Sequence, residues 1–478
     1  MKKSLLLASA LLIGTSAFAV VRDGDKLDNV TVGANTYSMT NRWIVDNNHD
    51  MASWQKLASY NTGFRTACIA GDYILVAGWP KENFINAAGE EKNDGVAHLL
   101  KFKLEDGSFV SDTKLTLDGA LHTGTGVANQ IGCDNYGHVW IADMCFDTGK
   151  GGIKLYLVDI ESGELTALPE VNPLEAGETA STAAVRMDYC NVIGDITGVE
   201  EKAHFMASFN TDKLVLVRAL REQGSAEWVG DFDGYFYMDP QQIEETYPMA
   251  KNEETGEEKP QGNWGTAPML CMINEGEFLG ENFYVDGFTT APVIYNVSGT
   301  MVDGFANKTD LAPDLGTNGI AEFSIGADNF VVYSTMQYNK EPGCQARIAC
   351  FGESFEYANL VSCWDFPTAG LGTVSDGGTR AHCLVTKEYV DANGNVGIYV
   401  LTYKCYNGMG VYVVAQEGFE DPNPVPSYPE IGGVEGIEAD NNAPAVYYNL
   451  QGVQVANPEN GLYIVKRGNN VAKELIRK

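Results

Sequence analysis

The feature that most constrains the fold is a strand–turn–strand unit that recurs along the chain. In each copy a short apolar run leads into a turn rich in Gly, Asp and Asn, and a second run of β-branched and aromatic residues follows. Clear copies occupy residues 64–78, 127–143, 185–208, 320–335 and 380–401, and a blurred copy occupies 266–285. Their starts are about 63 residues apart on average, a spacing typical of repeated supersecondary units.

Each unit can supply one small antiparallel sheet. The repeat therefore predicts an all-β fold, a six-bladed β-propeller over residues 20–418, with seven blades as the alternative. An earlier apolar run at Trp43–Val45 should complete the last sheet, because closing the ring removes exposed strand edges. The innermost strands should begin near Phe64, Val127, Val185, Thr266, Ile320 and Arg380.

Residues 1–19 have the organisation of a secretory signal peptide. Lys2 and Lys3 form a basic segment, Leu5–Ile13 an apolar segment, and Ala17–Ala19 a cleavage site of small residues. We therefore expect these residues to be removed on export. No other stretch has the roughly 18 apolar residues that cross a bilayer, so we expect no membrane span.

The expected mature chain is strongly acidic. The whole chain has 32 basic and 64 acidic residues, so loss of Lys2 and Lys3 leaves 30 against 64, a net charge of −34. Nucleic acids and anionic membrane surfaces are bound through clustered Lys and Arg. The charge therefore argues against both as partners.

Ten cysteines in an exported chain permit disulfides, because that compartment is oxidising. Five of them lie inside apolar, strand-like runs, where a free cysteine packs as a small hydrophobic residue. Cys344 and Cys350, with Cys363 nearby, are the best candidates for pairing. The sequence has no CxxC motif, so it supports neither a zinc ribbon nor a thioredoxin-type redox site.

One repeat has a recognisable blade pattern. Residues 134–143 (DNYGHVWIAD) form a hairpin signal, 153–160 a third strand, and 161–164 another turn. This pattern resembles a blade of the NHL and SMP-30-like propellers. The resemblance implies a fold and no particular activity.

The composition changes after the repeats. Residues 419–445 are rich in Pro and Gly and read as a linker. Residues 446–478 contain the segments YYNLQGVQV and GLYIV, which resemble the last motifs of the C-terminal sorting domain of type IX secretion cargo. The resemblance implies export machinery as a partner and an extracellular or outer-surface location. A small β module packed on the propeller is the alternative, and it would leave the protein in the periplasm.

The candidate ligand site lies where the innermost strands begin, because propellers usually bind ligands at a channel mouth. Arg65, Arg186 and Arg380 occupy matching places there and could hold an anion through bidentate hydrogen bonds. The alternative is that each Arg pairs with a nearby acid such as Asp188. At the equivalent start of another innermost strand stands Asn129, a further candidate ligand residue. The neighbouring polar side chains that could bind hydroxyl groups are Gln130, Asp188, Tyr189 and His382.

The sequence contains no metal-binding or nucleophile motif. The six histidines show no HExxH or HxH spacing, and no nucleotide-binding loop is present. We therefore expect no cofactor, although an acidic surface leaves a divalent cation open. The sequence favours a secreted or surface-displayed propeller that binds a glycan or a small anion. The alternative is a propeller hydrolase or lyase, either lactonase-like or glycan-cleaving.

Overall fold

The computed structural model shows an all-β chain that divides into two compact units, residues 1–424 and 425–478. The structure describes residues 27–46, 53, 57, 63–79, 95–145, 152–171, 187–209, 215–230, 236–237, 249–251, 258–260, 268–274, 279–287, 290–298, 300–304, 319–335, 343–372, 382–421, 445–448, 454–456, 461–467 and 470–476. The signal-peptide segment and most of the predicted linker lie outside these residues.

The described part of the first unit contains six sheets of at least four strands each. The first strands of each sheet are consecutive in the chain and pair antiparallel, and further strands from elsewhere in the chain extend the second and the last sheet. The first sheet contains β3 (Thr66–Ala70), β4 (Tyr73–Gly78), β5 (His98–Lys103) and β6 (Phe109–Lys114). The second contains β9 (Gln130–Cys133), β10 (Val139–Ala142), β11 (Leu155–Val158) and β12 (Glu164–Ala167), and it is extended by β7 (Thr116–Leu117) and β8 (Ala120–Leu121). The third contains β13 (Met187–Ile193), β14 (Ala203–Phe209), β15 (Val215–Arg221), β16 (Val229–Gly230) and β17 (Phe236–Tyr237).

The other three sheets follow the same order along the chain. They contain β20 (Met269–Met272), β21 (Asn282–Gly287), β22 (Thr290–Asn296) and β23 (Met301–Gly304); β24 (Ile320–Ile325), β25 (Asp328–Ser334), β26 (Ala346–Gly352) and β27 (Val361–Phe366); and β28 (Cys383–Val390), β29 (Val396–Lys404), β30 (Gly408–Gln416), β2 (Asn35–Asp46) and β1 (Val30–Val32). A separate hairpin pairs β18 (Met249–Lys251) with β19 (Glu258–Pro260).

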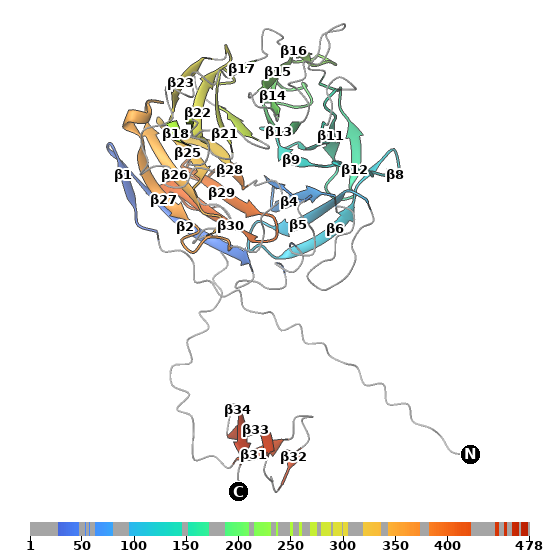
Figure 1. Cartoon of the computed structure of the whole chain (residues 1–478), viewed down its shortest axis with the longest axis vertical. Coiled ribbons are helices and arrows are strands. Elements are labelled where there is room, and N and C mark those ends of the chain that lie inside the picture. The colour runs from blue at the N-terminus through green and yellow to red at the C-terminus, as the bar shows by residue number, and fades with distance from the viewer. Residues whose placement is uncertain are drawn as a thin grey trace, which may run out of the picture. The chain divides into compact units, whose positions relative to one another are not determined.

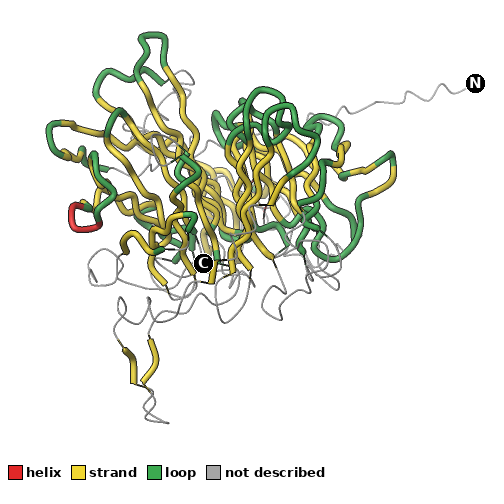
Figure 2. The backbone as a smooth tube through the Cα atoms, turned by 90° about the horizontal axis from the view of Figure 1, so that it is seen from above, coloured by secondary structure: helices red, strands yellow, loops and turns green. Residues whose placement is uncertain are grey.

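The six sheets surround a common centre (Figure 1). Their first strands, β3, β9, β13, β20, β24 and β28, contact one another in this order, and β28 contacts β3 again. Each first strand begins within three residues of its predicted start. The predicted β-propeller is confirmed, and the sheets appear edge-on as yellow strands joined by green loops in Figure 2.

The N-terminal strand completes the last sheet, as the sequence predicted. β2 pairs antiparallel with β30 from Tyr37↔Gln416 to Asp46↔Gly408, with a register shift between Asn41 and Trp43. One sheet therefore joins the two ends of the propeller. This arrangement leaves no first or last repeat with an unpaired edge at the point of closure.

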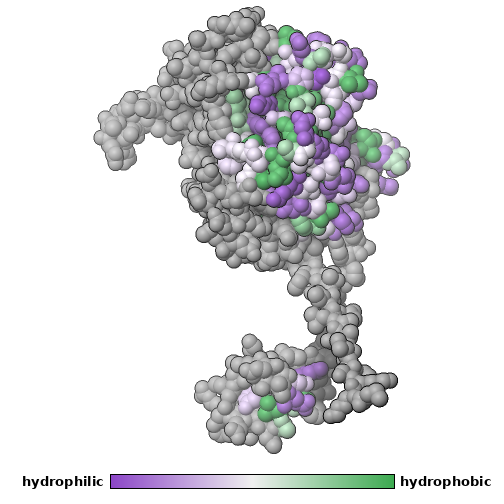
Figure 3. Space-filling view, turned by 90° about the vertical axis from the view of Figure 1, so that its right-hand side faces the viewer, coloured by the Kyte–Doolittle hydropathy of each residue, from purple (hydrophilic) through white to green (hydrophobic). Residues whose placement is uncertain are grey.

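The core lies between neighbouring sheets, because alternate side chains of a strand face opposite sides. On β3, Ala67 and Ile69 pack in the cluster shared with the closing sheet, whereas Cys68 and Ala70 pack in the cluster shared with β9–β12. The apolar runs in the sequence are therefore buried on both faces. On the outer side of the ring, hydrophilic and apolar residues are interspersed (Figure 3), and Leu121 on β8 is half exposed.

The second unit is described by itself as one four-stranded sheet of order β32-β31-β33-β34. Its strands are β31 (Val446–Tyr448), β32 (Gln454–Val455), β33 (Gly461–Arg467) and β34 (Asn470–Ile476). The rings of Tyr447 and Tyr463 meet edge to face at 6.4 Å, and Val465 is buried. In the described part of the chain, no helix is long and apolar enough to cross a membrane.

The predicted cysteine pairing is wrong. All ten cysteines lie in described segments, and all are free thiols. Cys344 is buried near the Nδ2 of Asn407, and Cys350 is buried in the core of its sheet. Burial raises the pKa of the Cys350 thiol to about 11 and that of Cys363 to about 12, so both thiols stay protonated and unreactive at neutral pH.

Candidate functional site: the central channel

The centre of the propeller holds a cavity of about 210 Å³ that is lined by residues of all six first strands. In a propeller the first strand of each sheet is an edge strand, so its inward N–H and C=O groups need partners. Side chains from neighbouring sheets supply them. We call these contacts the hydrogen-bond belt, and they run round the channel from sheet to sheet.

The belt begins between β3, β9 and β13. The Thr66 hydroxyl accepts a hydrogen bond from the Ile131 N–H at 2.8 Å. Gln130 then binds both edge groups of the next strand, because its Oε1 accepts from the Cys190 N–H at 2.7 Å and its Nε2 donates to the Cys190 carbonyl at 2.5 Å. Two edge groups of β13 are therefore satisfied by a single amide side chain.

The belt continues to β20 and β24 through one amide and one carboxylate. Asn191 Oδ1 accepts from the Met272 N–H at 2.9 Å, and Glu322 Oε1 accepts from the Asn274 N–H at 3.1 Å. The carboxylate of Glu322 thus closes the end of β20. Glu322 is therefore a polar residue of a first strand whose carboxylate already has a structural role.

Two further contacts close the belt. The Thr386 hydroxyl donates to the Glu322 carbonyl at 2.7 Å. The Ala67 N–H donates to Cys383 Sγ at 3.3 Å, and the Cys383 thiol donates to the Ala67 carbonyl at 3.6 Å. Side chains therefore link every neighbouring pair of first strands, including the pair at the point of closure.

At the mouth where the first strands begin, the predicted Arg65 is buried and paired. Its Nη1 lies 2.7 Å from Asp188 Oδ1, and the two side chains are at most 3% exposed. The Asn129 amide donates to the Asp188 carbonyl at 2.6 Å. Arg65 therefore neutralises a buried acid, as in the alternative interpretation of the sequence. Arg186 and Arg380 lie outside the described residues.

Tyr189 and His382 are also buried in the fold. Tyr189 packs in the cluster between the sheets of β20 and β24. His382 lies between two hydroxyl groups, with Nδ1 2.8 Å from Ser334 Oγ and Nε2 2.6 Å from Thr402 Oγ1. Burial, helped by the neighbouring Lys404, lowers the pKa of His382 to about 3, so this ring is neutral and links strands.

The opposite mouth lies where the first strands end. A cavity of about 340 Å³ lies there, adjoining the channel, and residues of β9, β24, β28 and β29 line it together with Asn274, which follows β20. We call it the end mouth. Its lining includes the polar side chains of Asn135, Asn274, Glu322, Ser324, Lys387 and Glu388.

Lys387 is the cation of the end mouth. It lies on β28, is half-buried and lines both the channel and the end mouth. It makes no hydrogen bond or ion pair with another described residue. Sequence reasoning missed it, although a lysine inside an innermost strand of a strongly acidic chain is a detectable signal.

Hydrogen bonds fix the amides at the end mouth. Asn135 Nδ2 donates to Asn274 Oδ1 at 3.0 Å, and Asn135 Oδ1 accepts from the Gly194 N–H at 3.1 Å. The Asn274 Nδ2 group is left as a donor that faces no described acceptor. The end mouth therefore offers donors, an ammonium and an amide, next to the carboxylates of Glu322 and Glu388.

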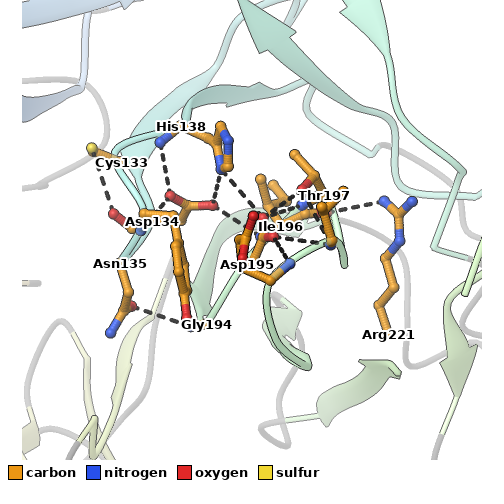
Figure 4. Close-up of polar contacts among 12 residues, drawn as sticks. Cys133, Asp134, Asn135, His138, Gly194, Asp195, Ile196, Thr197 and Arg221 are labelled. Atoms are coloured by element: carbon orange, nitrogen blue, oxygen red, sulfur yellow. Dashed lines mark hydrogen bonds and ion pairs between the residues drawn. The ribbon is translucent and has the colours of Figure 1, made fainter. Parts of the chain in front are cut away.

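Beside the end mouth, Asp134, His138 and Asp195 each place one ligand-type atom within 4.8 Å of the others (Figure 4). Backbone N–H groups of Tyr136, His138 and Ile196 already donate to the Asp134 carboxylate at 2.8–2.9 Å. Asp195 receives N–H groups of its own turn in the same way. These hydrogen bonds give Asp134, His138 and Asp195 a structural role, because they hold the β9–β10 turn against the β13–β14 turn. We call this cluster of three residues the latch.

Comparison with known proteins yields similarity at the level of fold. No family model and no curated protein matches the sequence. The chain is similar to the crystal structure of a DUF4623 family protein from Bacteroides eggerthii, with a TM-score of 0.50, 11% identity, and coverage of 82% of this chain and 78% of that chain. Polysaccharide lyase Uly1 overlaps with a TM-score of 0.35 and 9% identity, over 74% of this chain and 78% of that chain. The α-L-arabinofuranosidase Arb93a of Fusarium graminearum overlaps with a TM-score of 0.35 and 8% identity, over 75% and 96%.

Proposed function

We propose that the protein is an exported binding propeller whose end mouth binds an anionic, hydroxylated ligand, such as a uronate unit of an acidic glycan. The observation that carries the proposal is the ammonium of Lys387, which lines the end-mouth cavity and pairs with no residue of the described chain. In a chain this acidic, an unpaired cation inside a concave site is an attractive partner for a carboxylate.

The groups around Lys387 suit the rest of a sugar ring. The Asn274 amide can donate to a ring or hydroxyl oxygen, and the Ser324 and Glu388 side chains can accept hydroxyl protons. A small number of polar groups that converge on a concave surface is typical of binding sites for small polar ligands. The same acids disfavour a ligand of high negative charge, so the proposal is limited to a single carboxylate.

A calorimetric titration with glucuronate, galacturonate and short oligouronates tests this proposal. Lys387→Met should weaken binding by about ten- to a hundredfold, as expected for loss of one charge-assisted contact. Lys103→Met is the matched control, since Lys103 is exposed on β5 and its loss changes the net charge equally. Equal affinities of the two variants would reject Lys387 as the anion contact, and equal binding of neutral sugars would reject the ligand class.

The alternative function is hydrolysis or elimination at the same mouth. Glu322 and Glu388 both line its cavity, and a carboxyl pair is the usual requirement for glycosidic cleavage. Incubation of wild-type protein and Glu388→Gln with oligouronates, followed by assays for reducing ends and unsaturated products, separates binding from cleavage. Product formed by the wild type and lost in the variant would replace the binding proposal with an enzymatic one.

Export forms the second part of the proposal. Its support is the signal-like segment at residues 1–19 and the sorting-like motifs at 446–478. We propose that the mature chain begins at Val20 and that the C-terminal unit directs it across the outer membrane. Deletion of residues 446–478 should then retain the protein in the periplasm of a host with the matching secretion system. Unchanged surface display of the deleted form would reduce the unit to a structural module.

A further inference from the structure

A second concave surface lies between two neighbouring sheets, apart from the channel. We call it the interblade groove. It has a volume of about 530 Å³ and is formed by the β3–β4 turn, the β9–β10 turn and the end of β11. Asp72, Tyr73 and His138 contribute polar groups to its lining, whereas Val139, Leu157 and Ile160 form apolar walls.

His138 is held rigidly at the edge of this groove. Its Nδ1 lies 3.0 Å from Asp134 Oδ2 and 3.2 Å from Asp195 Oδ1, and both carboxylates are fully buried (Figure 4). Burial opposes ionisation of Asp195, but hydrogen bonds from Glu200 and Thr197 outweigh it, so the pKa of Asp195 lies below its ordinary value. The contact of Nδ1 with Asp134 Oδ2 is a hydrogen bond, and since a carboxylate oxygen accepts, Nδ1 of His138 donates.

This arrangement assigns the role of the other ring nitrogen. With the proton on Nδ1, Nε2 accepts a hydrogen bond when the ring is neutral and donates one when the ring is protonated. Nε2 makes no hydrogen bond with a described residue, and the His138 side chain is 37% exposed. The side chain that joins the two turns thus also presents its Nε2 atom, in a fixed orientation, at the edge of the groove.

The rest of the groove adds acceptors and an aromatic surface. The Asp72 side chain is exposed and has no hydrogen bond or ion pair with another described residue. Lys101 Nζ lies 4.7 Å from the centroid of the Tyr73 ring, and the same ammonium pairs with Glu161 at 2.7 Å. Lys101 is therefore already used, and it fixes the tyrosine at the groove.

We infer that the interblade groove is a binding site for a neutral sugar unit, which donates a hydroxyl proton to Asp72, forms a second hydrogen bond with His138 Nε2 and packs its C–H face on the apolar walls. The exposed Asp72 carboxylate, with no cation among the described lining residues, disfavours an anion, in contrast to the end mouth. The volume suits one or two sugar rings. This inference does not depend on the ligand proposed for the end mouth, because the two sites share no lining residue.

Methyl-labelled NMR of the full protein tests the inference directly. A panel of neutral methyl glycosides should shift the methyl signals of Val139, Leu157 and Ile160, which line the groove, and leave the Ile398 methyl at the end mouth unchanged. Shifts at Ile398 alone would place the neutral sugar in the end mouth and overturn the inference. If none of the groove methyl signals shifts with any glycoside of the panel at the highest ligand concentration, the inference is also overturned.

Two variants identify the contacts. Asp72→Asn should weaken glycoside binding about tenfold with an unchanged melting temperature, since the Asp72 side chain has no structural partner in the described chain. Glu227→Gln, an exposed acid on another sheet, is the control and should bind like the wild type. His138→Phe should abolish the groove shifts, and its melting temperature reports the loss of the latch separately. Wild-type affinity in Asp72→Asn would refute the acceptor role.

Discussion

Removal of the Gln130 amide is the sharpest test of the hydrogen-bond belt. Gln130→Met keeps the length of the side chain but deletes both bonds to Cys190, at 2.5 and 2.7 Å. Each buried group left without a partner costs about 1–3 kcal/mol. The channel has room for water, which can rehydrate the Cys190 groups in part, so we expect a total loss of about 2–3 kcal/mol.

The matched control is Gln223→Met on the surface of another sheet. Gln223 Nε2 also donates to two carbonyls, those of Val199 at 3.2 Å and Glu200 at 2.7 Å, but both contacts are exposed. Bulk water replaces these bonds, so the change should stay within about 0.5 kcal/mol. Gln130→Glu keeps the acceptor for the Cys190 N–H and loses the donor, so its cost should lie between the two.

Urea unfolding of the mature protein, followed by fluorescence and circular dichroism, measures these differences from the transition midpoint and slope. Coincident transitions by the two probes are needed to convert midpoints into free energies. If Gln130→Met and Gln223→Met lower stability equally, the belt has no special role in holding the ring. The inner edges would then be stabilised by channel water alone.

Three further changes follow from contacts in the core. Gly132→Ala would place a Cβ 2.3 Å from the Trp140 indole, so it should lower the free energy of unfolding by about 1–3 kcal/mol in a urea titration. Arg65→Met removes the cation that lies 2.7 Å from the buried Asp188 carboxylate and should cost about 3–5 kcal/mol, with part of the loss recovered in the double variant Arg65→Met, Asp188→Leu. Burial lowers the pKa of His382 to about 3 from an unfolded value near 6.5, so the unfolded chain takes up the proton first. Stability should therefore fall progressively as the pH drops from about 6.5 towards 3, and His382→Gln should flatten that slope; an unchanged slope would contradict the buried neutral ring.

The architecture could be predicted from the sequence because its signals are local. An apolar run, a Gly-rich turn and a second run define a hairpin wherever they occur, and six spaced copies define the repeat. The closing strand at Trp43–Val45 could be predicted for a different reason. A ring built from edge strands requires its first and last sheets to be joined, and one unpaired apolar run stood ahead of the first repeat.

The sequence left the roles of the polar residues open, with an Arg–acid pair only as one alternative, because their partners are remote in sequence. Arg65 and Asp188 are 123 residues apart, and nothing in the chain specifies that the folded sheets bring them within 2.7 Å. The pairing of His382 with Ser334 and Thr402 likewise depends on three strands of two sheets. The sequence identified where polar groups occur near the channel, but the fold decides which of them are already used.

The belt therefore sets a standard for assigning function inside this channel. The inner-edge N–H and C=O groups of the first strands need partners, so a polar side chain on such a strand more often bonds the edge of a neighbouring strand than a ligand. Thr66, Gln130 and Asn191 do so. A ligand contact should be a polar group that the belt does not use. Lys387 meets that condition on β28, directly after Thr386, which donates to the Glu322 carbonyl. A lysine in the belt would donate its ammonium protons to an edge carbonyl, but an ammonium cannot accept a hydrogen bond from an edge N–H. Its place in the innermost strand thus has no structural explanation among the described residues, which makes a ligand the simplest reason for it.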